Sequence, residues 1–410
     1  MTTIHHGDCI EVMSQMPPES VDAIVTDPPY GLGFMGKKWD DLPPSQEWAE
    51  ACYRALKPGG HIAAFGGTRT WHRLAVAIED AGFEMRDSLA WLYGSGFPKS
   101  MDVSKAIDKA AGAEREVVGE KMRPDGKPVM AARNPERWTN AEGWDRPWRS
   151  DPDRIAATGQ ITAPATPEAA QWSGWGTALK PAFEPIVLAR KPLAEKTVAR
   201  NVLAYGTGAI NVDACRIETD WDTDPTRRGW QGRNLASQSN VSFVDHHKEV
   251  SQPNPSGRWP ANVLLDHHAA AWVDEQSGVT VATKTAVSDE RGAEGSHIFA
   301  GASLGRRDPS NSYSDSGGAS RFFYTAKAPK RERPNVDGVQ HPTVKPLAIM
   351  RWLLRLVTPP GGTVLDPFAG SGATIEAAII EGFSPIGIEL EAEYLPLIQH
   401  RIDRQAGDES

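Results

Sequence analysis

Cysteine is scarce in this chain, and long hydrophobic runs are absent from it. The three cysteines stand far apart along 410 residues, which suits a reducing compartment and argues against a disulfide framework. No apolar run approaches the roughly 20 residues that span a bilayer, and the N-terminus lacks the basic and then apolar pattern of an export signal. Because 40 % of the residues are hydrophobic, we expect a soluble globular protein of the cytoplasm with no membrane partner.

Metal-binding patterns are also missing. The chain has no Cys-x-x-Cys pair, and its histidine pairs, His246-His247 and His267-His268, fit no familiar zinc arrangement with Cys215. We therefore predict no metal site and assign these residues structural or surface roles.

Positive charge is in deficit, because the net charge is -9. This is the wrong sign for a protein that coats nucleic acid. It does not exclude an enzyme that acts on nucleic acid, since binding depends on a local basic surface rather than on the total charge.

Strand and helix signals alternate near both ends of the chain. In 1–93 and again in 336–410, apolar strand-like runs are followed by amphipathic helices, which predicts βα units and a mostly parallel sheet. The ranges 94–180 and 200–335 are rich in Gly, Pro, Ser, Asn and Trp and have weak periodicity, which is typical of long functional loops. An apolar run within 181–199 predicts one core strand that returns to the sheet.

The segment Asp27-Pro28-Pro29-Tyr30 directly follows a strand-like run. An aromatic amine, such as adenine N6 or cytosine N4, is a poor nucleophile because its lone pair is delocalised into the ring. A carboxylate and a backbone carbonyl that accept its two N–H groups would return electron density to the nitrogen, by positioning and electrostatics. The prolines donate no N–H and stiffen the turn, and Tyr30 offers a flat face to an extruded base. An ordinary strand-ending turn is the alternative interpretation.

A glycine segment, Phe368-Ala369-Gly370-Ser371-Gly372, lies between a strand-like run ending near Asp366 and a helix-like run. Nucleotide cofactors meet α/β sheets at such a position, where glycines permit close approach to backbone. The next strand ends at Glu389, whose carboxylate could accept ribose hydroxyls. The third glycine of the dinucleotide fingerprint is absent, which disfavours a nicotinamide enzyme, and a plain strand–helix connection remains the alternative.

These segments together resemble the DNA amino-methyltransferases that use S-adenosylmethionine, in the motif order of the β group. In that order the Asp-Pro-Pro-Tyr half precedes the target-recognition region, and the cofactor half comes last. Three further segments match the family, at 5–8, 321–327 and 341–346. The resemblance covers about 1–93, 181–192 and 321–403.

The resemblance implies roles for the matching residues of the catalytic segment. Asp27 would bind the target amine, the carbonyl of Pro28 would assist within the turn that Pro29 stiffens, and Tyr30 would stack on the base. The amine would then attack the methyl group directly and in line.

The resemblance also implies that S-adenosylmethionine is the cofactor, bound by Asp8, Thr343, Lys345, Asp366, Phe368, Gly370, Gly372 and Glu389. Asp8 would contact its adenine end and Glu389 its ribose. Asp366 would lie near its methionine amino group, and Thr343 and Lys345 near its carboxylate, while the phenylalanine and glycines shape the pocket. Asp8 could instead simply cap a helix, and Lys345 could be a solvated lysine at a helix start.

The fold that the resemblance implies is a Rossmann-like α/β fold with a seven-stranded mixed sheet assembled from both chain ends. Its expected parts are a catalytic half at 1–93, an irregular insertion at 94–180, a core strand at 181–199, a target-recognition region at 200–335 and a cofactor half at 336–410. The irregular region would form a lobe that faces the sheet across a cleft for double-stranded DNA.

Basic residues near aromatic ones are candidates for DNA contact, because they suit phosphate binding and stacking. They gather at Arg190, Lys191, Lys196 and Arg200, and at Lys327, Lys330, Arg331 and Arg333, close to Phe322, Phe323 and Tyr324. Solvated linker charge is the alternative. The tryptophans of the insertion, Trp138, Trp144, Trp148, Trp172 and Trp175, are expected to pack in local clusters.

The leading hypothesis is a DNA adenine-N6 methyltransferase, because an aspartate at the first catalytic position is associated with adenine in the family. A cytosine-N4 enzyme is the nearest alternative, followed by an RNA or protein amine methyltransferase and by a non-enzymatic DNA-binding module. A cytosine carbon-5 enzyme is disfavoured, since no cysteine follows a proline. Without a P-loop for an NTP-driven nuclease, DNA cleavage would need a separate restriction endonuclease. A homodimer is possible.

Overall fold

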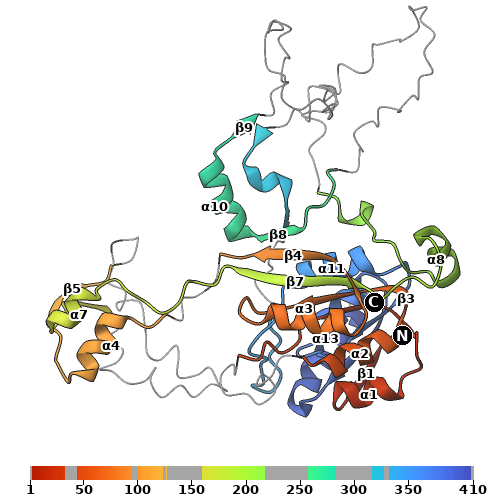
Figure 1. Ribbon diagram of the computed structural model, residues 1–410, viewed down its shortest axis with the longest axis horizontal. Helices are drawn as coiled ribbons and strands as arrows, with labels where there is room; N and C mark the ends of the chain where they lie inside the picture. Colours follow the sequence, from red (N-terminus) through yellow and green to blue (C-terminus); the bar gives the residue numbers. More distant parts are fainter. Residues whose placement is uncertain are drawn as a thin grey trace, which may run out of the picture.

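The computed structural model describes residues 2–32, 44–94, 96, 100–122, 126, 159–217, 257–281, 316–326 and 332–407. Its main feature is a sheet of nine strands in the order β1-β13-β12-β2-β3-β7-β4-β8-β11 (Figure 1). These strands are β1 (Thr3–His6), β2 (Val21–Thr26), β3 (Leu56–Phe65), β4 (Glu84–Leu92), β7 (Phe183–Arg190), β8 (Val263–Asp266), β11 (Tyr324–Ala326), β12 (Thr363–Asp366) and β13 (Ser384–Glu389). The sheet is mixed, because β7 runs antiparallel to β3 and β4 whereas the other neighbours pair in parallel.

The two ends of the chain share the centre of this sheet. Strand β12 lies between β2 and β13, with Val364 opposite Ala23 and Leu365 opposite Ile24. All six residues of β2 are buried, as expected for a parallel strand covered on both faces. Because β2 and β12 are parallel, the segments that follow them emerge at the same edge.

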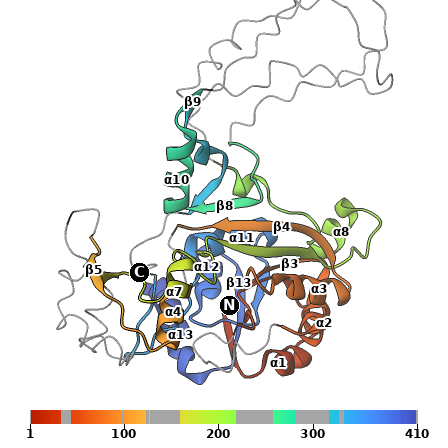
Figure 2. The same cartoon turned by 60° about the vertical axis from the view of Figure 1, so that its left-hand side comes forward.

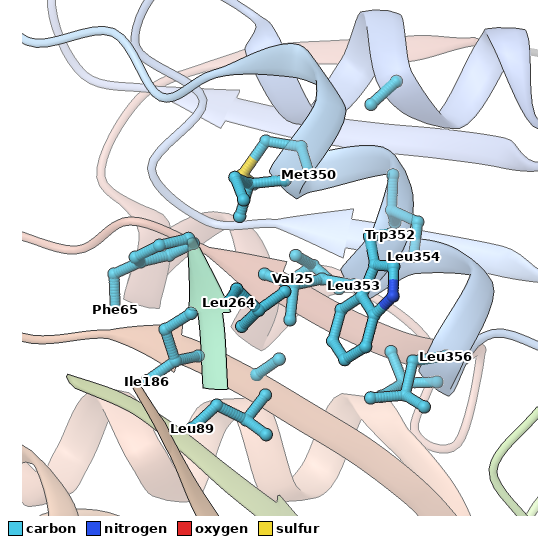
Figure 3. Packing of buried hydrophobic residues seen from close by; sticks show 14 of the residues in the cluster. Val25, Phe65, Leu89, Ile186, Leu264, Met350, Trp352, Leu353, Leu354 and Leu356 are labelled. Carbon is cyan, nitrogen blue, oxygen red and sulfur yellow. The ribbon is translucent and has the colours of Figure 1, made fainter. Parts of the chain in front are cut away.

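Helices cover both faces of the sheet. The helices α1 (Cys9–Gln15), α2 (Gln46–Ala55) and α3 (Trp71–Asp80) pack on one face, and α11 (Leu347–Val357) and α12 (Ala373–Ile380) pack on the other. Alternate strand residues divide between these faces: Val25 points toward α11, and Ile24 toward α1 and α2. Figure 3 shows the hydrophobic cluster between the sheet and α11, in which Trp352 and Leu353 of α11 lie against the sheet.

The prediction of seven strands was wrong by two. The additional strands are β8 and β11, which extend the sheet beyond β4. Both come from the range 200–335, where we expected a separate irregular lobe. These strands have only four and three residues, too few to establish a periodicity, and their parallel partners are distant in sequence.

The described residues contain further elements outside the layers already given. A small unit of α4 (Val103–Ala110), β5 (Val117–Glu120), β6 (Gln160–Thr162) and α7 (Pro167–Gln171) lies outside the main sheet (Figure 2). The others are α8 (Val198–Tyr205), η4 (Asp213–Cys215), α10 (His267–Ser277), β9 (Thr280–Val281), β10 (Ser316–Gly317), η6 (Ala319–Phe322), η7 (Ala392–Tyr394) and α13 (Leu395–Gly407).

The small unit is organised around one buried carboxylate. Asp108 of α4 accepts hydrogen bonds from the backbone N–H groups of Ala165 and Thr166, each at 3.0 Å, and from Arg115 Nη1 at 2.5 Å. A buried carboxylate is tolerated when it is paired and hydrogen-bonded in this way.

The helices of the described residues include none that combines the length and the hydropathy of a membrane span.

Candidate functional site

A cavity of about 1560 Å³ opens at the edge of the sheet where β2, β12 and β13 end. A site for one small molecule typically has about 300–1,000 Å³, so this volume has room for two ligands side by side. All predicted site residues except Gly372 line it. Ligands of open α/β sheets bind at this edge, outside the carboxyl ends of the strands.

The turn of residues 27–30 follows β2 directly and is held by hydrogen bonds. We call it the catalytic turn after its predicted role. Tyr30 Oη donates to Asp27 Oδ1 at 2.9 Å, and the Tyr30 carbonyl accepts from Thr70 Oγ1 at 2.7 Å. A Cβ added to Gly67 would lie 3.1 Å from the Tyr30 ring. Pro28 is buried, and both prolines line the cavity. Burial raises the pKa of Tyr30 well above its usual range, and the carboxylate of Asp27 raises it further.

Lys345 contacts the catalytic turn although 318 positions separate it from Asp27 in the sequence. Its Nζ donates to Asp27 Oδ2 at 2.7 Å and to Tyr30 Oη at 3.0 Å. Burial alone would lower the pKa of Lys345, but the neighbouring carboxylates of Asp27 and Glu184 outweigh it and raise the pKa. The ammonium is therefore a stable cation beside Asp27, and not a solvated charge at a helix start. Its contact with a methionine carboxylate stays a prediction.

Sequence reasoning missed Glu184. Its Oε2 lies 3.2 Å from Lys345 Nζ and 3.3 Å from Tyr30 Oη, and its side chain is 19 % exposed. Because β7 is antiparallel, its first residues lie where β3 and β4 end: Ile186 pairs with Phe65, and Phe183 with Leu92. The signal in the sequence was an acidic residue at the start of a buried strand. It places Glu184 in the site only if the strand is known to run antiparallel to its neighbours.

The glycine segment and the end of β13 form the other side of the cavity. Glu389 Oε2 accepts from Gly370 N at 2.6 Å, and Glu389 Oε1 accepts from Glu391 N at 2.8 Å. Burial raises the pKa of Glu389 to about 7. Gly370 has φ +54°, and a Cβ there would lie 3.2 Å from His341 Nε2. A left-handed backbone with this close neighbour favours glycine.

Asp366 connects the two sides of the cavity. Its Oδ1 accepts from Thr26 Oγ1 at 2.6 Å and from Phe368 N at 3.1 Å. Burial raises the pKa of Asp366 to about 6. Thr26 ends β2 and Asp366 ends β12, so this hydrogen bond joins the two strand ends, and the segments that follow them line the same cavity.

Three other predicted cofactor residues lie around this centre. Asp8 caps α1, where Oδ1 accepts from Ile10 N at 2.8 Å, and it also lines the cavity. The Thr343 carbonyl is in contact with the His341 ring at Nδ1. Gly372 lies behind the cavity wall and caps α12 in the left-handed conformation.

The predicted basic cluster at 190–200 is divided between buried and exposed residues. Arg190 is buried and pairs with Glu84 at 2.6 Å, and Lys191 is buried and donates to the Leu56 carbonyl at 2.7 Å. Lys196 and Arg200 are exposed, but they follow the end of β7, which is opposite to its cavity end. Of the second cluster, Lys327, Lys330 and Arg331 lie outside the described residues, and Arg333 lines the cavity.

The remaining aromatic and histidine predictions have mixed outcomes. Trp172 and Trp175 form an exposed edge-to-face pair with ring centroids 5.0 Å apart, whereas Trp138, Trp144 and Trp148 lie outside the described residues, as do His246 and His247. His267 and His268 contact each other at 3.9 Å between ring centroids. Within the part of the chain that the structure describes, no cluster of three or more potential metal ligands occurs.

The fold and cavity define an α/β protein with one acidic turn and one glycine turn at the same sheet edge. The chain belongs to the DNA methylase family, whose profile matches residues 21–400. It is 34 % identical to the type II methyltransferase M.HpaI of Haemophilus parainfluenzae over 110 residues, which are 25 % of this chain and 35 % of that protein. It is 44 % identical to the DNA adenine methyltransferase YhdJ of Escherichia coli (strain K12) over 63 residues, 15 % of this chain and 21 % of YhdJ.

These matches therefore span well under half of the curated relatives' own length. Among solved structures, the PvuII DNA methyltransferase (cytosine-N4-specific) aligns with 99 % of this chain and 92 % of its own. The TM-score is 0.42 and the sequence identity is 14 %.

Proposed function

We propose that this protein transfers a methyl group from S-adenosylmethionine to the N6 amine of an adenine in double-stranded DNA. The observation that carries the proposal is that the ends of β2 and β12 are hydrogen-bonded to each other through Thr26 and Asp366, so that Asp27 and Gly370 of the segments that follow line one cavity. A nucleotide-like cofactor and an extruded base would meet there. When bound, the cofactor would supply an electrophilic methyl group. The target nitrogen would bond to the methyl carbon as the bond from that carbon to sulfur breaks, and one amine proton would pass to solvent.

The residues present fit the cofactor. The Glu389 carboxylate ends a strand beside the glycine turn, where it could accept ribose hydroxyls. Gly370 is left-handed and has no side chain, whereas a Cβ there would crowd His341. The absence of a side chain lets the cofactor approach the backbone. Asp366 and Asp8 present carboxylates to the same cavity and would hold the amino group and the adenine end.

The residues of the catalytic turn would orient and polarise the target amine. Asp27 would accept one N–H and the Pro28 carbonyl the other, which concentrates electron density on the nitrogen. Asp27 can do so while bound to Tyr30 and Lys345, because each carboxylate oxygen has two acceptor sites. The Tyr30 ring would contact the extruded base.

Adenine is proposed over cytosine from the aspartate of the catalytic turn, together with the match to an adenine methyltransferase. The test is expression in a methylation-deficient host, followed by single-molecule sequencing of its DNA. We expect N6-methyladenine in one short sequence context. N4-methylcytosine would change the base assignment, and unmodified DNA from cells that contain folded protein would refute the proposed activity.

A further inference from the structure

Four polar side chains from three segments of the chain meet at the catalytic turn. We call Asp27, Tyr30, Glu184 and Lys345 the Asp27 cluster. The Lys345 ammonium lies 2.7 Å from Asp27 Oδ2, 3.0 Å from Tyr30 Oη and 3.2 Å from Glu184 Oε2. The Tyr30 hydroxyl lies 2.9 Å from Asp27 Oδ1 and 3.3 Å from Glu184 Oε2. The cluster therefore links the acid of the catalytic turn to a second acid through a cation and a phenol.

We propose that Glu184 is a positioning residue that sets how strongly Asp27 accepts the target amine, because it shares the Lys345 ammonium with Asp27. The inference rests on the proposed function for its consequence in methyl transfer. The sharing of the ammonium itself is a property of the protein without cofactor or DNA.

Charge and donor counts support this sharing. An ammonium has three N–H donors, and Lys345 has three acceptors within reach. Two carboxylates and one ammonium leave the cluster with a net negative charge. Without Glu184, the ammonium would pair with Asp27 alone and neutralise it, and a neutralised carboxylate is a weaker acceptor for an amine N–H.

Burial makes these interactions strong. The side chains of Lys345 and Glu184 are only 10 % and 19 % exposed, and electrostatic interactions strengthen where water is excluded. The ammonium also lies 4.9 Å from the centre of the Phe65 ring. Among the described residues, the other titratable neighbours include Tyr93, whose pKa is raised to about 12 mainly by burial, and Asp366, whose carboxyl interacts electrostatically with that of Asp27.

Strand β7 fixes the Glu184 carboxylate in place. The strand is hydrogen-bonded on both sides, to β3 and to β4, and Glu184 itself is opposite Trp91. Asp27 lies in the turn after β2, Glu184 lies in β7 and Lys345 precedes α11, so the two acids belong to different elements and are bridged by the cation and the phenol. Such an arrangement suits adjustment of Asp27 without contact between Glu184 and the base.

The first test measures Lys345 in the protein without cofactor or DNA. The rate of acylation of Lys345 by an amine-specific reagent at alkaline pH is followed by mass spectrometry, with the exposed Lys196 as internal reference. In Glu184→Gln, we expect labelling of Lys345 to be roughly tenfold faster, the effect of a one-unit fall in its pKa when one neighbouring charge is removed. An unchanged rate would mean that Glu184 does not share the ammonium, and would overturn the inference.

The second test is a double-mutant cycle in single-turnover methyl transfer, with Glu184→Gln, Lys345→Met and both together. Glu184→Gln alone should slow transfer about 10-fold, with the dissociation constant of S-adenosylmethionine unchanged. In the Lys345→Met background, the same substitution should change the rate by less than about twofold, because no ammonium is left to redistribute. Losses that multiply would contradict an action through Lys345.

Controls separate charge from folding. Glu79 is an exposed glutamate of α3 that does not line the cavity, so Glu79→Gln should leave both readouts unchanged. If the double variant does not fold, Glu184→Asp replaces it, because this variant keeps the charge and should transfer faster than Glu184→Gln. A slower Glu184→Asp would refute the role of charge. If labelling responds but the wild type methylates no DNA, the proposed function fails while the sharing of the ammonium stands.

Discussion

At the scale of single residues, we predict that Asp27 acts in methyl transfer and not in cofactor binding. We expect Asp27→Ala to lower the rate of methyl transfer by at least about 100-fold. The affinity for S-adenosylmethionine should stay nearly unchanged. The fold should tolerate this change, because Lys345 keeps Glu184 as an ionic partner at 3.2 Å. Transfer assays and calorimetric titration of the cofactor test this separation, and an equal loss of cofactor affinity would contradict it.

Glu389 predicts a pH dependence of cofactor binding. Its pKa is about 7 because of burial, so the carboxyl is protonated below this pH and ionised above it. The ionised form is the stronger acceptor for ribose hydroxyls, because it has a free acceptor site on each oxygen beside the bonds from Gly370 N and Glu391 N, whereas protonation uses one of these sites and removes the charge. Affinity should therefore rise from pH 6 to pH 8, as calorimetry at several pH values can show. Glu389→Gln should bind weakly and lack this rise, and a rise that persists in the variant would assign it to another group.

At the scale of elements, the start of α12 depends on a glycine. Gly372 has φ +81°, and a Cβ there would lie 3.2 Å from Ile398 Cα of α13. Gly382, after the end of α12, has a similar φ of +77° with open space around it. In both alanine variants the free energy of unfolding should fall by about 1–2 kcal/mol, because a residue with a Cβ is strained in the left-handed conformation. Gly372→Ala should lose more in urea unfolding because helix backbone must also move, and equal losses would show that the close approach is unimportant.

The elements were predictable to different degrees. The apolar patterns predict a strand at 21–26 and a helix at 346–357, and β2 and α11 have these bounds to within one residue. The pattern also predicts a final helix at 391–402, whereas α13 begins at Leu395 after a short 3-10 turn. Strands β8 and β11 were missed because such short segments become strands only through the partner to which they bind.

At the scale of the whole molecule, the position of basic residues relative to the cavity predicts where DNA binds. Lys180 and Arg333 are exposed and line the cavity, so neutralising each should weaken DNA binding and reduce the salt dependence by about one counterion. Lys196 and Arg200 lie beyond the opposite end of β7, and their alanine variants are matched controls that should bind normally. Titrations of duplex DNA at several salt concentrations measure this, and a larger effect in the controls would place the DNA elsewhere.

The two turns and the strands that precede them can be predicted from the printed residues alone, because turn chemistry and apolar strand patterns are local properties. The resemblance added that both turns belong to one site. The entry of Glu184 into the site and the burial of Arg190 follow instead from the three-dimensional arrangement, since both depend on the antiparallel direction of β7. Strand direction is set by long-range pairing, which no short window of sequence contains.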